Sequence, residues 1–197
     1  DPNCSALAPR PQNISGMYPA AIQADAGFCT VLEKRADADA LFNPFSIVTN
    51  KPGGRAKGDP ATDELVAVPY HVAYADDMKA VSNELRSAAA LLAGDPSEAA
   101  FKAYLEAAAQ AFLDGSWFKA DVAWKAMTAT NSKWYLRVAP DEVYEDPCSR
   151  KANFAVTFAR INQESLDWQQ RLEPVKDDME AALAALAGPP YEARQVG

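Results

Sequence analysis

Apolar residues recur at a helical spacing through the middle and the end of the chain. Between Tyr70 and Leu92 they repeat every three or four positions, while charged residues fall mostly on the opposite face of the same predicted helix. Asp95-Pro96-Ser97-Glu98 supplies a capping residue, a proline in the first turn and an early acid, which predict the start of a second helix that Gly115 ends. The pattern predicts further helices over residues 116–127 and from residue 164 onward, with a kink or break at Pro174.

Two other segments show the period of two that is typical of half-buried strands. Trp134, Leu136 and Val138 alternate with larger polar residues, and residues 152–161 alternate in the same way. Shorter apolar stretches at residues 45–49 and 65–69 lie on either side of a loop rich in glycine and proline. Together these elements predict an α+β fold in which Ala-rich helices pack on a small antiparallel or mixed sheet. We expect residues 1–45 to form an N-terminal arm with helices and residues 46–197 to form the α+β domain.

An acidic turn follows the first of these strands. We expect Pro140 to stop regular pairing because it has no N–H to donate to a sheet. Beyond it, Asp141, Glu142, Glu145 and Asp146 surround Tyr144, and four carboxylates so close together repel one another unless a cation or a set of donors faces them. The turn is either a solvated acidic surface or a recognition element that offers a carboxylate and a phenol to a positively charged ligand.

Composition narrows the possible ligands. The net charge of the 197 residues is -8, which argues against nucleic acid because phosphate binding needs clustered Lys and Arg. An acidic surface is compatible with a peptide or another amine-bearing small molecule. No run of about 18 apolar residues is present, so the sequence contains no predicted membrane span.

Histidine usage limits what chemistry the chain can perform alone. His71 is the only histidine, whereas a catalytic zinc site commonly takes at least two. A nucleophilic site that used His71 has no partner close to it in sequence. We therefore predict that the chain contains no complete active site, no catalytic residue and no metal ligand.

The cysteines and the first residue bear on localisation. The chain begins with Asp1 rather than Met, so we expect that an upstream segment has been removed. Cys4 and Cys29 lie near the start and are candidates for a disulfide, while Cys148 stands alone after the acidic turn. These features favour a secreted or periplasmic protein. The alternative is three reduced, buried thiols.

Several short segments resemble the dipeptidyl peptidase III family and its zinc-dependent hydrolase relatives. The stretch Val138-Ala139-Pro140-Asp141-Glu142-Val143-Tyr144-Glu145-Asp146-Pro147 is similar to the substrate-binding segment of that family, and Ser149-Arg150-Lys151-Ala152-Asn153-Phe154 resembles its next strand. Upstream, Val68-Pro69-Tyr70, the helix end Ala88-Ala89-Ala90-Leu91-Leu92 and Ala120-Asp121-Val122-Ala123-Trp124 occur in the family's order. The resemblance covers roughly residues 46–190 and is most specific over residues 120–158.

The resemblance implies a substrate-binding role for the acidic turn. Glu142 would bind the free α-amine of a peptide, Tyr144 would hydrogen-bond its backbone or a developing oxyanion, and Asp146 would belong to the same element. The family's zinc ligands lie C-terminal to this segment and have no counterpart here. The resemblance therefore implies a proteolytically processed or divided hydrolase, in which the C-terminal half or a second chain carries the zinc. The alternatives are a non-catalytic protein that binds a peptide or amine through the same residues, and a structural domain whose acidic turn is only surface.

Overall fold

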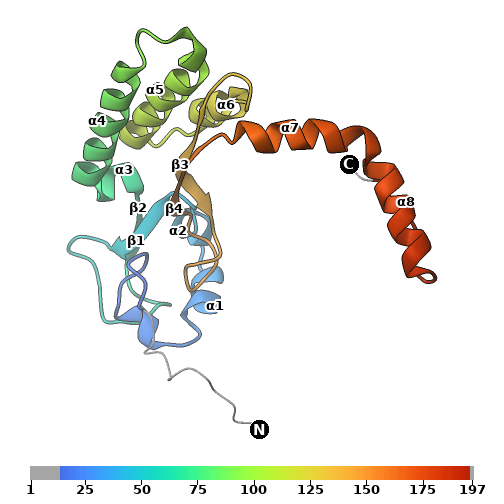
Figure 1. Ribbon diagram of the computed structural model, residues 1–197. Helices are drawn as coiled ribbons and strands as arrows, with labels where there is room; N and C mark the ends of the chain where they lie inside the picture. Colours follow the sequence, from blue (N-terminus) through green and yellow to red (C-terminus); the bar gives the residue numbers. More distant parts are fainter. Residues whose placement is uncertain (1–13, 196–197) are drawn as a thin grey trace, which may run out of the picture. The chain divides into compact units, whose positions relative to one another are not determined.

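The computed structural model describes residues 14–195, which fall into two units (Figure 1). The first unit extends to Ala159 and the second begins at Arg160. Within the first unit, helices α4 (Ala75–Leu91), α5 (Ala99–Asp114) and α6 (Phe118–Ala126) gather at one end (Figure 1). α1 (Phe28–Glu33) lies toward the other end, and α2 (Ala38–Leu41) lies beside the strands between them. The fold is α+β with two antiparallel two-stranded sheets, as the sequence predicted.

The N-terminal segment shares a hydrophobic core with the first sheet. It contains η1 (Ile22–Ala24), α1 (Phe28–Glu33) and α2 (Ala38–Leu41), followed by the antiparallel strands β1 (Ser46–Asn50) and β2 (Leu65–Pro69). Buried apolar side chains from all these parts form one cluster: Tyr18, Ile22, Phe28, Leu32, Leu41, Val48 and Leu65. Residues 14–45 and the first sheet therefore bury their apolar side chains together.

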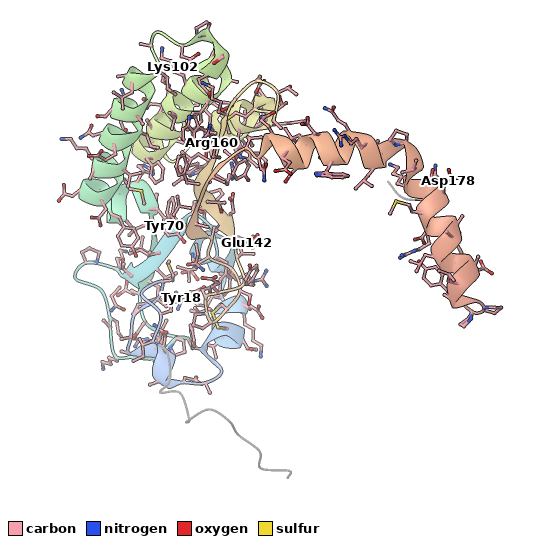
Figure 2. All side chains as sticks on the ribbon, viewed as in Figure 1. Tyr18, Tyr70, Lys102, Glu142, Arg160 and Asp178 are labelled. Carbon is pink, nitrogen blue, oxygen red and sulfur yellow. A yellow bond between two sulfur atoms is a disulfide. The ribbon has the colours of Figure 1, made fainter. Side chains whose placement is uncertain are left out.

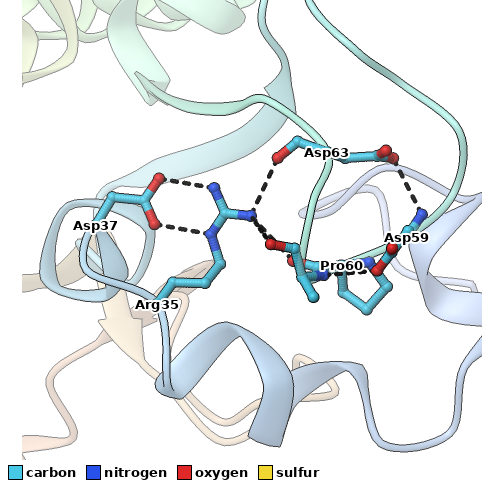
Figure 3. A network of polar contacts seen from close by, with 6 residues as sticks. Arg35, Asp37, Asp59, Pro60 and Asp63 are labelled. Carbon is cyan, nitrogen blue, oxygen red and sulfur yellow. Dashed lines mark hydrogen bonds and ion pairs between the residues drawn. The ribbon is translucent and has the colours of Figure 1, made fainter.

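The loop between β1 and β2 is fixed by a polar network around Arg35 (Figure 3). The guanidinium pairs with Asp37 at 2.7 Å and donates to the backbone carbonyls of Pro60 and Asp63, each at 3.0 Å. The buried Asp63 carboxylate accepts hydrogen bonds from the backbone N–H groups of residues 57–59. The loop that the sequence predicted is thus an ordered part of the first unit.

Four helices form the second core of this unit. They are α3 (Tyr70–Ala73), α4 (Ala75–Leu91), α5 (Ala99–Asp114), which η2 (Pro96–Glu98) precedes, and α6 (Phe118–Ala126). α4 and α5 pack closely through small residues, and the buried hydroxyl of Ser82 donates to the Ala109 carbonyl at 2.7 Å. The predicted helices are confirmed, except that the backbone leaves the helical region at Tyr74 and divides the first of them into α3 and α4.

Gly115 ends α5 as predicted, and the structure gives two reasons for a glycine there. Its φ of 72° lies in the left-handed region that disfavours other residues. A Cβ at this position would also come within 2.6 Å of the His71 Nδ1. The only histidine of the chain therefore lies against the end of α5.

The second sheet is a ribbon of β3 (Trp134–Glu142) and β4 (Asn153–Arg160). Both strands were predicted, but β3 does not stop at Pro140 as expected and continues to Glu142. Within the described residues β3 pairs only with β4, so the proline can face the unpaired edge, where no ladder hydrogen bond is required of it.

The second unit consists of α7 (Gln163–Leu172), η3 (Glu173–Val175) and α8 (Lys176–Ala187). The Asn162 side chain caps α7 by accepting from the Ser165 N–H at 3.3 Å. The 3₁₀ turn that contains Pro174 confirms the predicted break. Over residues 14–195, no helix is both long and apolar enough to cross a membrane.

A disulfide joins Cys29 of α1 to Cys148, 119 positions away. The predicted pairing of Cys4 with Cys29 is therefore wrong, and Cys4 itself lies outside the described residues. The expectation rested on proximity in sequence, whereas the fold brings the segment after β3 against α1. The bridge packs on the N-terminal cluster of buried residues.

We predict that replacing Cys29 and Cys148 by Ser lowers the free energy of unfolding by about 3 kcal/mol, because the bridge closes a long loop and restricts the unfolded chain. Denaturant titration of the variant and of the oxidised parent measures this difference. Peptide mapping without reduction is the accompanying check, and a Cys4–Cys29 peptide in place of a Cys29–Cys148 peptide would contradict the assignment.

Candidate functional site

The acidic turn leaves the end of β3 and is open to solvent. Glu142 is exposed where the strand ends, and the Tyr144 side chain is 67% exposed. Figure 2 shows Glu142 beside the ribbon, with Tyr18 further toward the N-terminal segment. Two of the three predicted ligand-binding residues, Glu142 and Tyr144, are therefore accessible to a ligand.

Asp146, the third predicted ligand-binding residue, lies in a different environment from Glu142 and Tyr144. It is 5% exposed, and its carboxylate accepts from the Tyr18 hydroxyl at 2.9 Å and from the backbone N–H groups of Cys148, Arg150 and Lys151 at 3.1, 2.7 and 2.8 Å. Burial and the nearby negative charge of this carboxylate raise the pKa of Tyr18. Because both carboxylate oxygens are occupied by donors of the fold, Asp146 holds the turn in place, and the predicted role as a ligand residue does not fit its geometry.

Lys151 fixes the same segment from inside the protein. Its side chain is fully buried, and its Nζ donates to the carbonyls of Leu41 and Asn43 and to the Ser46 hydroxyl, the last two at 2.9 and 3.1 Å. Burial lowers the pKa of Lys151 to about 8, against the opposing effect of the Asp146 charge. Residues 146–152 are therefore held to the N-terminal segment by a disulfide, a buried carboxylate and a buried amine.

The other side of the turn is held by Arg137 of β3. Its guanidinium pairs with Asp121 of α6 at 2.8 Å and with Asp141, and it lies 4.9 Å from the centre of the Trp124 ring. Hydrogen bonds to Asp141 are the largest cause of the raised pKa of Arg137. This ion pair fixes the end of β3 immediately before Glu142.

These contacts resolve the predicted crowding of carboxylates. Asp141 is paired with Arg137 and Asp146 accepts from internal donors, while Glu142 and Glu145 face solvent. The turn is therefore a short exposed segment between two fixed ends. A solvated surface and a recognition element are both compatible with this geometry.

The described residues offer no zinc site. Nowhere in residues 14–195 do three or more His, Cys, Asp or Glu side chains gather in a way that could hold a metal ion. Cys29 and Cys148 are joined in the disulfide, and His71 lies against Gly115. The zinc that the resemblance implies is expected on a C-terminal half or a second chain, and this finding does not bear on it.

Comparison with known proteins supports the resemblance at the level of fold. No family model matches the chain. The solved structure of dipeptidyl peptidase III from Caldithrix abyssi matches with a TM-score of 0.62 and 26% identity, over 85% of this chain and 29% of that one. The enzyme of the same name from Corallococcus sp. strain EGB matches with a TM-score of 0.61 and 24% identity, over 89% and 30%. The fold of this chain is similar to that of part of a dipeptidyl peptidase III chain.

A relative found by sequence similarity has a different name from the two solved structures. Nudix hydrolase 3 of Arabidopsis thaliana is 27% identical over 152 residues, which make up 77% of this chain and 18% of that protein. The chain spans less than a third of each of these relatives. A name given to the whole of a much longer protein does not by itself describe the activity of the matched segment.

We predict that Tyr18→Phe lowers the free energy of unfolding by about 2 kcal/mol, because it removes one donor from the buried Asp146 carboxylate. Thermal or denaturant unfolding measures the change. Tyr144→Phe is the matched control, since the exposed Tyr144 should leave stability unchanged. Equal losses in the two variants would contradict the structural role of Asp146.

The buried Lys151 predicts a dependence of stability on pH. Its pKa of about 8 lies below the ordinary lysine value of 10.5, so the folded protein releases this proton at a lower pH than the unfolded chain does. Stability should therefore rise from about pH 8 toward pH 10, by up to roughly 3 kcal/mol. Above pH 10 the raised pKa values of Tyr18 and Tyr70 oppose this rise, because the unfolded chain then holds fewer phenolic protons.

Lys151→Met isolates the contribution of the Lys151 amine to the pH dependence of stability. The variant keeps the volume of the side chain, removes the titrating amine and should lose the rise between pH 8 and 10, although it is less stable overall. Urea unfolding at several pH values compares the two proteins. The same slope in both would show that Lys151 does not titrate in this range.

Proposed function

We propose that this chain is the substrate-binding portion of a dipeptidyl peptidase III-like peptidase, with Glu142 and Tyr144 as the residues that contact a peptide. The observation that supports the proposal is the likeness to dipeptidyl peptidase III structures together with an exposed Glu142-Val143-Tyr144 turn held at both ends. The acidic net charge of -8 is compatible with a ligand that carries an ammonium group.

The turn has the chemical groups that a peptide N-terminus requires. A carboxylate such as that of Glu142 forms strong charge-assisted hydrogen bonds with an ammonium group. The Tyr144 phenol can donate to a peptide carbonyl or to an oxyanion that develops from it. Because Arg137 and Asp146 fix the residues on either side, little further ordering of the backbone is needed when a ligand binds.

The reaction itself needs a group from elsewhere. Since the described residues do not fit zinc, the proposed metal site belongs to a further part of the same protein or to a second chain. When present there, zinc would activate the water that attacks the peptide bond. This chain's contribution is to bind and orient the substrate.

The disulfide supports a proposed location outside the reducing cytosol. Structural disulfides form and persist in oxidising compartments, and the Cys29–Cys148 bridge closes a loop that includes most of the first unit. We therefore propose that the protein is secreted or periplasmic. A non-catalytic peptide- or amine-binding protein is the second candidate, because the exposed turn lies in a chain whose described residues contain no metal site.

We expect Glu142→Gln to weaken binding of a short alanine peptide with a free α-amine by about tenfold or more, because the charge-assisted hydrogen bond is lost. Calorimetric titration measures the affinity, and an N-acetylated copy of the peptide should bind the parent and the variant equally weakly. Glu145→Gln is the matched control, since it removes a neighbouring charge without touching the proposed contact.

Intact mass and metal content of the natively purified protein then separate the two candidates. A second polypeptide that co-purifies with about one zinc ion supports the peptidase. A single chain without metal that still loses affinity in Glu142→Gln supports the binding protein. An unchanged affinity in both Glu142→Gln and Tyr144→Phe would remove both candidates.

A further inference from the structure

A cavity in the first unit is lined by residues of α2, β2, α3 and α5, among others. It has a volume of about 340 Å³, which is at the lower end of the range for small-molecule sites. Solvent-exposed residues that include Ala40, Asn43 and Pro69 surround its mouth, and buried residues that include Tyr70, Phe112 and Trp117 form its floor. The acidic turn contributes no residue to its lining, so this cavity is separate from the candidate site.

The apolar wall of the cavity is rich in aromatic rings. Phe112 and Trp117 pack edge-to-face with 5.0 Å between their ring centres, and Phe154 stacks on Phe112 at 5.4 Å. Tyr70, which Figure 2 labels, lies 5.6 Å from Phe154 between ring centres. A further ring in these surroundings gains offset-stacked or edge-to-face contacts in addition to the burial of its apolar area. The wall therefore favours a flat aromatic ligand over an aliphatic chain of the same size.

The residues that line the cavity include no Asp, Glu, Lys or Arg. The buried hydroxyls of the lining already donate within the protein: that of Tyr70 to the Ala152 carbonyl at 2.8 Å, and that of Ser46 to the Asn43 carbonyl at 3.0 Å. An ammonium group or a carboxylate that entered would lose its hydration and meet no opposite charge, which is costly. The cavity therefore suits an uncharged ligand.

Two polar side chains of the lining remain available to a ligand. The half-buried His71 forms no hydrogen bond or ion pair with the rest of residues 14–195. The side-chain carbonyl of Asn43 accepts from the Phe45 N–H at 2.9 Å, and its NH₂ group donates to none of the described residues. A phenol oxygen both donates and accepts, so it can bond to an imidazole in either direction and also accept from an amide.

We propose that this cavity is a binding site for an uncharged phenolic ring, whose hydroxyl hydrogen-bonds to His71. The ring lies against Phe112 and Trp117, and the Asn43 amide donates to the phenol oxygen. The phenol belongs either to a free small molecule or to the tyrosine side chain of a peptide, because the recognised chemistry is the same. The proposal does not rest on the contact of Glu142 with a peptide, since Glu142 lies outside the cavity lining.

The probe is p-cresol, and the reporter is the imidazole of His71. Because the untagged chain contains one histidine, proton NMR gives a single imidazole Hε1 signal. p-Cresol should shift this signal saturably, with half of the shift reached at about 1 mM, which is within reach of a ligand of this size. Toluene lacks only the hydroxyl, so it should bind about tenfold more weakly because the hydrogen bonds are lost.

Ala40→Phe should remove most of the shift, because the exposed Ala40 lies at the mouth and a larger side chain there fills the entrance. Ala90→Phe is the matched control, since Ala90 is an exposed alanine of α4 that does not line the cavity. Both variants should keep the unfolding midpoint of the parent, because neither alanine is buried. Glu142→Gln should leave the affinity for p-cresol unchanged, so failures of the two proposals give different results.

The peptide Ala-Tyr-Ala distinguishes the two sources of the phenol. Half-saturation below that of p-cresol supports a tyrosine side chain as the ligand, and half-saturation above it supports a small phenol. Three results would overturn the proposal: no shift with p-cresol at up to about 10 mM, equal affinities for toluene and p-cresol, and equal shifts in Ala40→Phe and the parent.

Discussion

The arrangement of the candidate site depends on the hydrogen bonds that the buried carboxylate of Asp146 accepts. Four donors from two distant parts of the chain converge on it, and an unpaired carboxylate in the same place would be strongly destabilising. The Cys29–Cys148 bridge and the buried Lys151 join the same two parts. Residues 14–45, which contain the predicted N-terminal helices, are therefore a support for the turn after β3.

This support explains how an acidic turn can remain ordered beside its own like charges. Arg137 neutralises Asp141 on one side, and internal donors satisfy Asp146 on the other. What remains exposed is the short segment with Glu142 and Tyr144. A binding element whose ends are fixed by the fold loses less conformational entropy on meeting a ligand than a free loop of the same sequence.

Local patterns in the sequence predicted the helices and strands. They did not predict the contacts between segments that lie far apart in the sequence. The periodicity of residues 70–92, the capping residues at 95–98 and Gly115 defined the helices correctly because each signal lies within one turn of the backbone it affects. The cysteine pairing was wrong because it depends on the fold bringing α1 to residue 148. Nothing around Lys151 distinguishes it from a surface lysine, and its burial follows from carbonyls more than 100 positions away.

The sequence predicted the candidate site only in part, as it did the fold. The resemblance pointed to Glu142, Tyr144 and Asp146 together, yet the structure separates them into two exposed side chains and one buried support. A sequence motif records which residues occur together, not which of them face solvent. The Arg137–Asp141 pair, which fixes the end of β3, was not predicted from the sequence either.

The proposed function divides binding and reaction chemistry between this chain and another part of the protein, and such a division has a physical consequence. Groups that bind the substrate and the transition state equally tightly lower KM but do not accelerate the chemical step. Glu142 contributes binding of this kind if it contacts a peptide α-amine remote from the bond that breaks. The same turn can therefore serve a peptidase that is completed by another part of the protein, or a protein that only binds.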